Sequence, residues 1–293
     1  MRRSKSLYRL GFVLALLHFW GGPCFSADKP LVLFGINLRY SPRTMYSRYQ
    51  PLMDYLTQNT PYRFELKITR DYGEALKDLT EGRTLISSLG DGAFVDAILL
   101  HGAVPIVKPL NENGRPSYRC AIVVPRDSRI GSLRELAGKR FAFGSHHSLT
   151  GNLIPRYMLQ SAGISGGNLG SLVTLKNHDA VTKAILKGQY DAGAIKDLFA
   201  AKYRQYGLRV LAYSAPLPSV PLVAGRHAPE ALKTAVGTAL LQLDPRNPAH
   251  KKLMSEWDEE FRYGFAAASA EDYRGVIGVF RAIPLGCGAR CHF

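Results

Sequence analysis

The sequence predicts an α/β fold of two lobes with a ligand cleft between them. Short apolar runs alternate with amphipathic helical segments from Leu31 onward, which is typical of a mainly parallel sheet flanked by helices. The alternation starts a second time at Tyr118, and beyond Pro216 the chain is mainly helical. Two such halves in one chain predict two lobes. In open α/β sheets, ligands bind at the carboxyl ends of the strands.

The first set of elements alternates strictly between strand and helix. Asp71 and Gly82 are typical of the start and the end of one helix, and a Thr-Pro pair ends another. The predicted strands cover 31–37, 64–68, 85–90 and 103–110, and the predicted helices cover 49–60, 71–82 and 93–102.

The second set repeats this order and leads into a helical tail. Strands 118–125 and 209–214 are expected to be the crossings between the lobes. The other strands are predicted over 139–144, 172–175 and 191–195, with helices over 132–138, 152–163, 178–189, 228–243, 248–261 and 270–283. We expect one lobe to comprise 28–117 and 215–293, and the other 118–214.

Residues 1–27 have the pattern of a secretory signal peptide. Arg2, Arg3, Lys5 and Arg9 precede an apolar run over 10–20, which is short for a membrane helix. The mature chain is therefore expected to be exported to the periplasm or beyond, and to be soluble there.

The mature chain is basic. Of the 38 basic residues four lie in the leader, which leaves 34 against 23 acidic residues, or a net charge near +11. A basic surface suits nucleic acid, a membrane surface or small anions. Because the chain is expected to be exported and its basic residues are scattered, small anions are favoured and nucleic acid is not expected.

The segment GSHHSLTGNLIPRYML, residues 144–159, brings a strand to the start of a helix. Backbone N–H groups at such a start lack helical partners and attract anions. Ser148 and Thr150 add hydroxyl donors, His147 adds a ring donor, and Gly151 permits close approach of the backbone. The alternative is that Ser148 or Thr150 is only an N-cap, worth about 1 kcal/mol.

Catalytic motifs are missing from the sequence. It has no H-E-x-x-H, no phosphate-binding P-loop and no G-x-G-x-x-G. His146, His147 and His178 lack metal-ligand spacing, although His178 stands at a predicted helix start. These observations favour a binding protein over an enzyme, with no metal and no required cofactor.

The chain resembles the periplasmic phosphonate, phosphite and phosphate-binding proteins of ABC importers over about 31–280. The segments YRCAIVVPRDSRIGSLRELAGKRFAFGSHHSLTGNLIPRYMLQSAGI and NHDAVTKAILKGQYDAGAIKD carry the resemblance. It implies a two-lobed periplasmic-binding-protein fold, a small phosphorus oxyanion as ligand, and delivery to the membrane subunits of an ABC permease. A monomer is expected.

The resemblance also implies particular site residues. The family's Ser-Thr-Ser-Gly phosphoryl loop falls on Ser148, Leu149, Thr150 and Gly151, and its histidine falls on His178. An aromatic residue near the start of the chain corresponds to Tyr40, with Tyr46 as a second possibility. The aromatic residue after the third strand, usually Tyr, is Phe94.

Three departures from the family pattern bear on the ligand. Leu149 and Phe94 each remove a hydroxyl, and Val220 stands where some members bind an amine with an acidic residue. Leaving a buried charged acceptor unpaired costs about 1–3 kcal/mol or more. Either backbone N–H groups, Lys196 or His147 compensate, or the ligand is another organic one such as a sulfonate or a pyrimidine.

The last seven residues, CGARCHF, suggest a second class of function. Haem c attachment normally places two residues between the cysteines, and here three separate Cys287 from Cys291. A covalent haem with His292 as axial ligand, a Cys287–Cys291 disulfide, and a metal bound by all three residues stay open. The first and third would make the chain a redox or sensor protein. Cys120, in an apolar run, is expected to be a core thiol.

Overall fold

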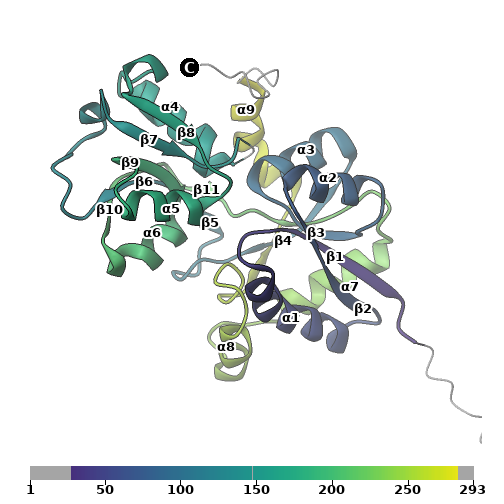
Figure 1. Cartoon of the computed structure of the whole chain (residues 1–293). Coiled ribbons are helices and arrows are strands. Elements are labelled where there is room, and N and C mark those ends of the chain that lie inside the picture. The colour runs from purple at the N-terminus through teal and green to yellow at the C-terminus, as the bar shows by residue number, and fades with distance from the viewer. Residues whose placement is uncertain (1–27, 147, 283–293) are drawn as a thin grey trace, which may run out of the picture.

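The computed structural model describes residues 28–146 and 148–282. Figure 1 shows two α/β lobes side by side, joined by segments that pass between them. This is the two-lobed fold that the sequence predicts. No helix among the described residues combines the length and the apolar character needed to cross a membrane.

The first lobe is built on a six-stranded sheet in the order β13-β4-β12-β3-β1-β2. β1 pairs in parallel with β2 and β3, and β12 is inserted antiparallel between β3 and β4. The strands are β1 (Leu31–Asn37), β2 (Arg63–Thr69), β3 (Ile86–Ser88), β4 (Val104–Pro109), β12 (Leu222–Ala224) and β13 (Phe265–Ala267).

Helices cover both faces of this sheet. The apolar side chains of α1 and α7 pack on one face, and those of α2 and α3 pack on the other. The helices of this lobe are α1 (Pro42–Asn59), α2 (Tyr72–Thr80), α3 (Asp91–His101), α7 (Glu230–Leu241), α8 (Pro248–Ser255) and α9 (Arg274–Ala282).

The second lobe has a five-stranded sheet in the order β10-β6-β9-β7-β8. β7 pairs in parallel with β8 and β9, whereas β6 is antiparallel to β9 and β10. The elements are β6 (Cys120–Pro125), β7 (Arg140–Phe143), a π-helical turn (Leu149–Leu153), α4 (Ile154–Ser161), β8 (Ser171–Thr174), α5 (His178–Leu186), β9 (Ala192–Lys196), α6 (Asp197–Tyr203) and β10 (Leu208–Tyr213).

The expectation of mainly parallel sheets holds for the consecutive βαβ units only. The strands next to the crossings between lobes, β6, β10 and β12, are antiparallel because the chain enters each lobe against the direction of those units. The crossings themselves overlap the strands expected for that role only at Tyr118. They include the short ribbon of β5 (Ser117–Tyr118) and β11 (Leu217–Pro218). This ribbon supports our proposal that the lobe boundaries lie at 117/118 and 214/215.

Among the predicted helices, α1 and α8 differ most from the structure in their bounds. α1 begins at Pro42, seven residues before the predicted start, because Ser41 caps it by accepting the Thr44 N–H at 3.3 Å. α8 ends at Ser255, although the pattern predicts a helix to Phe261. There the Asp258 carboxylate accepts the backbone N–H of Glu260 at 3.1 Å, a local bond that competes with helix. The three acidic residues 258–260 therefore leave the helix.

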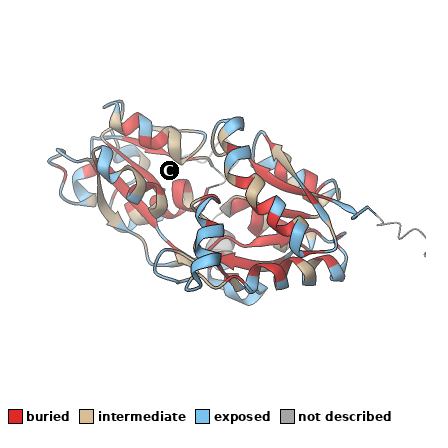
Figure 2. Ribbon diagram, turned by 90° about the horizontal axis from the view of Figure 1, so that it is seen from below, coloured by how far each residue is buried: buried red, intermediate tan, exposed pale blue. Residues whose placement is uncertain are grey.

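The apolar core is continuous between the lobes. One cluster of buried side chains joins α2 and α3 of the first lobe to β6, β7 and α4 of the second, and it includes the fully buried Cys120. Figure 2 shows the buried residues concentrated on the strands and on the inner sides of the helices. The lobes are thus packed against each other.

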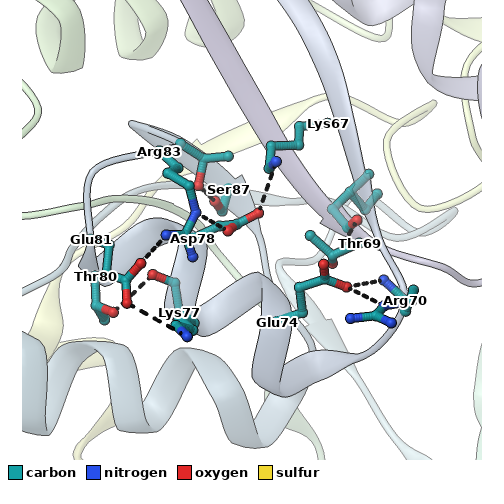
Figure 3. A network of polar contacts seen from close by, with 12 residues as sticks. Lys67, Thr69, Arg70, Glu74, Lys77, Asp78, Thr80, Glu81, Arg83 and Ser87 are labelled. Carbon is teal, nitrogen blue, oxygen red and sulfur yellow. Dashed lines mark hydrogen bonds and ion pairs between the residues drawn. The ribbon is translucent and has the colours of Figure 1, made fainter.

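A charged network on the first lobe is structural. The buried carboxylate of Asp78 on α2 forms ion pairs with Arg83 and with Lys67 of β2, the latter at 3.4 Å (Figure 3). These ion pairs fix α2 to the sheet edge, and none of the residues lines the cleft described below.

Candidate functional site

The carboxyl ends of six parallel strands meet in one pocket between the lobes. Asn37 is the last residue of β1 and Arg39 lies two residues beyond it, Tyr72 follows β2, and Gly90 follows β3. On the second lobe the pocket is lined by Ser148 after β7, by His178 after β8, and by Lys196, the last residue of β9. The pocket holds about 50 Å³. One water needs about 10–15 Å³ by the same measure, so a small tetrahedral anion fits.

Ser148 is both an N-cap and a lining residue of this pocket. Its Oγ accepts the Gly151 N–H at 3.0 Å, which starts the π-helical turn. The loop is closed by the Gly144 N–H, which donates to the Gly151 carbonyl at 2.7 Å. A serine hydroxyl that accepts one bond keeps its own proton to donate. The capping role therefore leaves Ser148 able to donate to an anion.

Gly151 brings this loop against His178. A Cβ at Gly151 would lie 3.0 Å from the Ser148 Oγ, 3.1 Å from the Gly144 Cα and 3.2 Å from the His178 Cε1. Contacts this close are rare for a real Cβ. The glycine is thus required by packing, and it lets the two helix starts of the second lobe, at Ser148 and His178, approach each other.

His178 is neutral in the folded protein. Burial, reinforced by the neighbouring Lys196 charge, lowers its pKa to about 3. The residue keeps some exposure, but its Nδ1 is buried and has no hydrogen-bond partner. A buried ring nitrogen without a partner costs free energy unless a ligand or water completes it. His178 therefore offers one uncharged hydrogen-bonding group to the pocket.

Asn37 of the first lobe also has a buried polar group without a hydrogen-bond partner. Its side chain is 3% exposed, and its Oδ1 has no partner. Because the oxygen and nitrogen of an amide are assigned from hydrogen bonding, either can face the pocket. Buried polar groups that lack partners thus point to the cleft from both lobes.

Ion pairs among two cations and one carboxylate connect the two lobes across the pocket. Glu260 forms ion pairs with Arg39 of its own lobe and with Lys196 of the second lobe. Although burial opposes its ionisation, these two cations lower the pKa of Glu260 to about 2. The Arg39 guanidinium also donates to the Ser88 Oγ at 3.0 Å and to the Tyr49 hydroxyl at 3.4 Å.

Tyr40 lines the pocket beside this group. Its ring stacks on Phe199 of the second lobe, with 6.4 Å between the centroids. Burial, together with the nearby Asp258 charge, raises the pKa of its hydroxyl. The hydroxyl therefore stays protonated and can donate a hydrogen bond.

The predicted site residues fall into four groups. Ser148, His178 and Tyr40 line the pocket, and so do Lys196 and Val220, the positions named for compensation and for amine binding. Thr150 is fully buried and, like Gly151, lies behind the lining. Phe94 packs in the core against Tyr273 at 5.0 Å and Tyr46 is half exposed, so neither lines the pocket. His147 lies outside the described residues.

The lining residues that sequence patterns missed include Asn37, Arg39, Asp258 and Glu260. Asn37 and Arg39 had a usable signal, since they lie at the end of a buried strand. Glu260 had none, because its segment was interpreted as the end of a helix.

A second cavity of about 400 Å³ adjoins the pocket on the side of the β5–β11 ribbon. The two cavities share Lys196, Leu198 and Glu260 as lining residues. Tyr118, Arg119 and Tyr213 line the larger one. The Lys196–Glu260 ion pair therefore lies where the small pocket meets the larger cavity.

The chain belongs to the family described as ABC transporter, phosphonate, periplasmic substrate-binding protein, whose model matches residues 34–273. Members of this family are solute-binding proteins of ABC transporters.

Three relatives illustrate the range of this similarity. The probable phosphite-binding protein PhnD1 of Prochlorococcus marinus is 25% identical over 53% of this chain and 56% of its own length, so the match spans about half of that protein. The phosphate-import protein PhnD of Mycolicibacterium smegmatis is 28% identical over 68% of each chain. The amino-acid-binding protein AabA of Dichelobacter nodosus is 25% identical over 72% of this chain and 85% of its own.

The solved structure of PhnD1 in complex with methylphosphonate has the same fold. It superimposes with a TM-score of 0.75 at 19% identity, covering 87% of this chain and 98% of that one. At this identity the likeness establishes the fold.

Proposed function

We propose that this protein binds a small phosphorus oxyanion, such as a phosphonate, phosphite or phosphate, in the cleft between its lobes. The observation that carries the proposal is the pocket where six parallel strands end. It gathers two cations, the Ser148 hydroxyl, and the buried Asn37 and His178 groups that lack partners. Such groups suit a tetrahedral oxyanion.

The protein would act by binding and delivery, without chemistry. Contacts from both lobes favour the closed form over the open one, so ligand binding would shift the protein toward closure. The family supports a periplasmic location and delivery to the membrane subunits of an ABC permease. The proposal also includes a signal peptide over 1–27 and a monomeric state, and it gives no role to nucleic acid or to a cofactor.

The larger cavity favours a second candidate within the same class of binding protein. Its volume of about 400 Å³ lies in the range of organic ligand sites. A phosphonate with a longer organic substituent, or another organic anion, would place that substituent there once the Lys196–Glu260 pair opens.

Calorimetry tests the proposal directly. The mature protein should bind at least one of methylphosphonate, phosphite and phosphate, and phosphonates with longer substituents test the second candidate. Native and denaturing mass spectra of protein purified from the periplasm should show a small ligand that is lost on denaturation. Absence of binding by all of these anions would contradict the proposal.

The haem and metal alternative rests on Cys287, Cys291 and His292, which lie outside the described residues. The matched family lends it no support. The denaturing mass spectrum tests it, because a covalent haem would survive denaturation, and a visible absorption band would accompany it.

A further inference from the structure

The charges around the pocket nearly balance within the protein. Residues 258–260 contribute three carboxylates. Four cations form ion pairs with these carboxylates, and they are Arg39, Arg48, Lys196 and Lys202. Arg48 and Lys202 neutralise Asp258 and Glu259 between them. Arg39 and Lys196 share Glu260, so this group at the pocket lining keeps a single positive charge for a ligand.

Each of these four cations forms an ion pair with at least one of the three carboxylates. Arg48 lies 3.6 Å from Asp258 and 3.4 Å from Glu259, and Lys202 lies 3.2 Å from Glu259. Arg39 and Lys196 share Glu260, whose side chain is 10% exposed. Glu260 thus removes one of the two positive charges that line the pocket.

From this arrangement we propose that Glu260 is a specificity-determining residue that makes the pocket select singly charged oxyanions over doubly charged ones. The proposal rests on the proposed function and refines it. A monoanion completes the charge balance, whereas a dianion leaves one negative charge uncompensated in a buried site, which is costly.

Other groups that face Glu260 fit this assignment. His178 on α5 is neutral because its pKa lies near 3, and Tyr49 on α1 is neutral because burial raises the pKa of its hydroxyl. Neither adds a cation that could hold a second ligand charge. Asp258, whose pKa is raised by burial and by Glu260, is the other acid at the pocket.

Methylphosphonate is a suitable probe, because it loses its second proton near neutral pH. Its dissociation constant should be measured by calorimetry at about pH 5.5 and about pH 8.5. If the monoanion alone binds, the wild-type protein should bind about tenfold more weakly at the higher pH, where the monoanion is a minor species.

Glu260→Gln should abolish this pH dependence or reverse it, because it returns one positive charge to the pocket. The ratio of the two dissociation constants within one variant cancels any common cost of losing an ion pair between the lobes. Glu259→Gln is the matched control: it removes the other bridge, to Lys202, without changing a lining residue of the small pocket. It should retain the wild-type ratio.

Each outcome decides the proposal. Tighter wild-type binding at the higher pH overturns it without any variant, so a poorly folded Glu260→Gln protein does not block the test. An unchanged ratio in Glu260→Gln, or flattening by Asp258→Asn in its place, also overturns it. If methylphosphonate, phosphite and phosphate all fail to bind at both pH values, the proposed function itself fails and the role of Glu260 with it.

Discussion

Glu260 and Lys196 form an ion pair across the cleft, and they come from opposite lobes and from positions 64 residues apart in the chain. A second such bridge joins Glu259 to Lys202 at 3.2 Å. The acidic residues of one lobe thus hold two lysines of the other, with the predicted oxyanion loop beside them.

Replacing the Ser148 hydroxyl should weaken binding. Ser148→Ala removes one donor to the ligand, and we expect methylphosphonate affinity to fall about tenfold. It also removes the cap on Gly151, so the free energy of unfolding should fall by about 1 kcal/mol. Calorimetry and urea unfolding measure the two effects. Ser269→Ala, which removes a capping hydroxyl away from the pocket, should lower stability alone. Equal affinities of the Ser148 variant and wild type would exclude this hydroxyl from the site.

The fit between Gly151 and His178 should tolerate no side chain. Gly151→Ala places a methyl group 3.2 Å from the His178 ring and 3.0 Å from the Ser148 Oγ. We expect a loss of about 1–3 kcal/mol of stability from overpacking and a clear loss of methylphosphonate affinity. Gly275→Ala, on a helix where a Cβ meets nothing within 4 Å, is the control and should be neutral or slightly stabilising. Wild-type stability and affinity in Gly151→Ala would contradict the packing described here.

Neutral His178 should make stability depend on pH. Its folded pKa of about 3 lies below the unfolded value near 6.5, so the unfolded state binds a proton in this range and the folded state does not. Stability from this group is complete above about pH 6.5 and is lost as the pH falls toward 3, with a slope of at most about 1.4 kcal/mol per pH unit.

Urea unfolding between about pH 5 and about pH 7 measures this slope. The free energy of unfolding of wild type should fall relative to that of His178→Gln as the pH is lowered. His227→Gln, at an exposed histidine, should behave as wild type does. Parallel pH profiles for wild type and His178→Gln would show that His178 binds a proton as readily in the folded state as in the unfolded state.

Arg39 should not be replaceable by lysine. Its guanidinium pairs with Glu260 while donating to Ser88 at 3.0 Å and to Tyr49 at 3.4 Å. A lysine ammonium is a point charge that cannot reproduce this planar fork. Arg39→Lys should therefore lose about 1–3 kcal/mol of stability together with methylphosphonate affinity. Arg43→Lys, at an exposed position on α1, should change neither. Thermal unfolding with and without the ligand would show the difference, and a full retention of both properties would refute the prediction.

Local sequence patterns were sufficient to predict the βαβ units and the start of α5. Apolar strands followed by polar or glycine residues mark strand ends, so Ser148 and His178 could be found without coordinates. The same rule identifies Asn37 and Arg39, since Asn37 ends β1 and Arg39 lies two residues beyond it. The place of Asn37 and Arg39 in the pocket was thus predictable from the strand end. The resemblance to the family directed attention to the neighbouring Tyr40 instead.

The resemblance placed other residues less well. Phe94 follows the family pattern in sequence but turns into the core against Tyr273, because an aromatic side chain without a hydroxyl gains more from burial there. The end of α8 was beyond local patterns too, since an Asx-type bond at Asp258 and a buried Trp257 decide where the helix stops.

By itself, the sequence determined the class of fold, the order of its elements and the loop that starts with Ser148. These depend on periodicity, capping residues and glycine positions, all of which act over a few residues. The tertiary structure alone decided that Glu260 would pair with both Arg39 and Lys196 and thereby set the charge of the pocket. Electrostatic balance in a buried site depends on distances between segments far apart in the chain, and no local pattern encodes those distances.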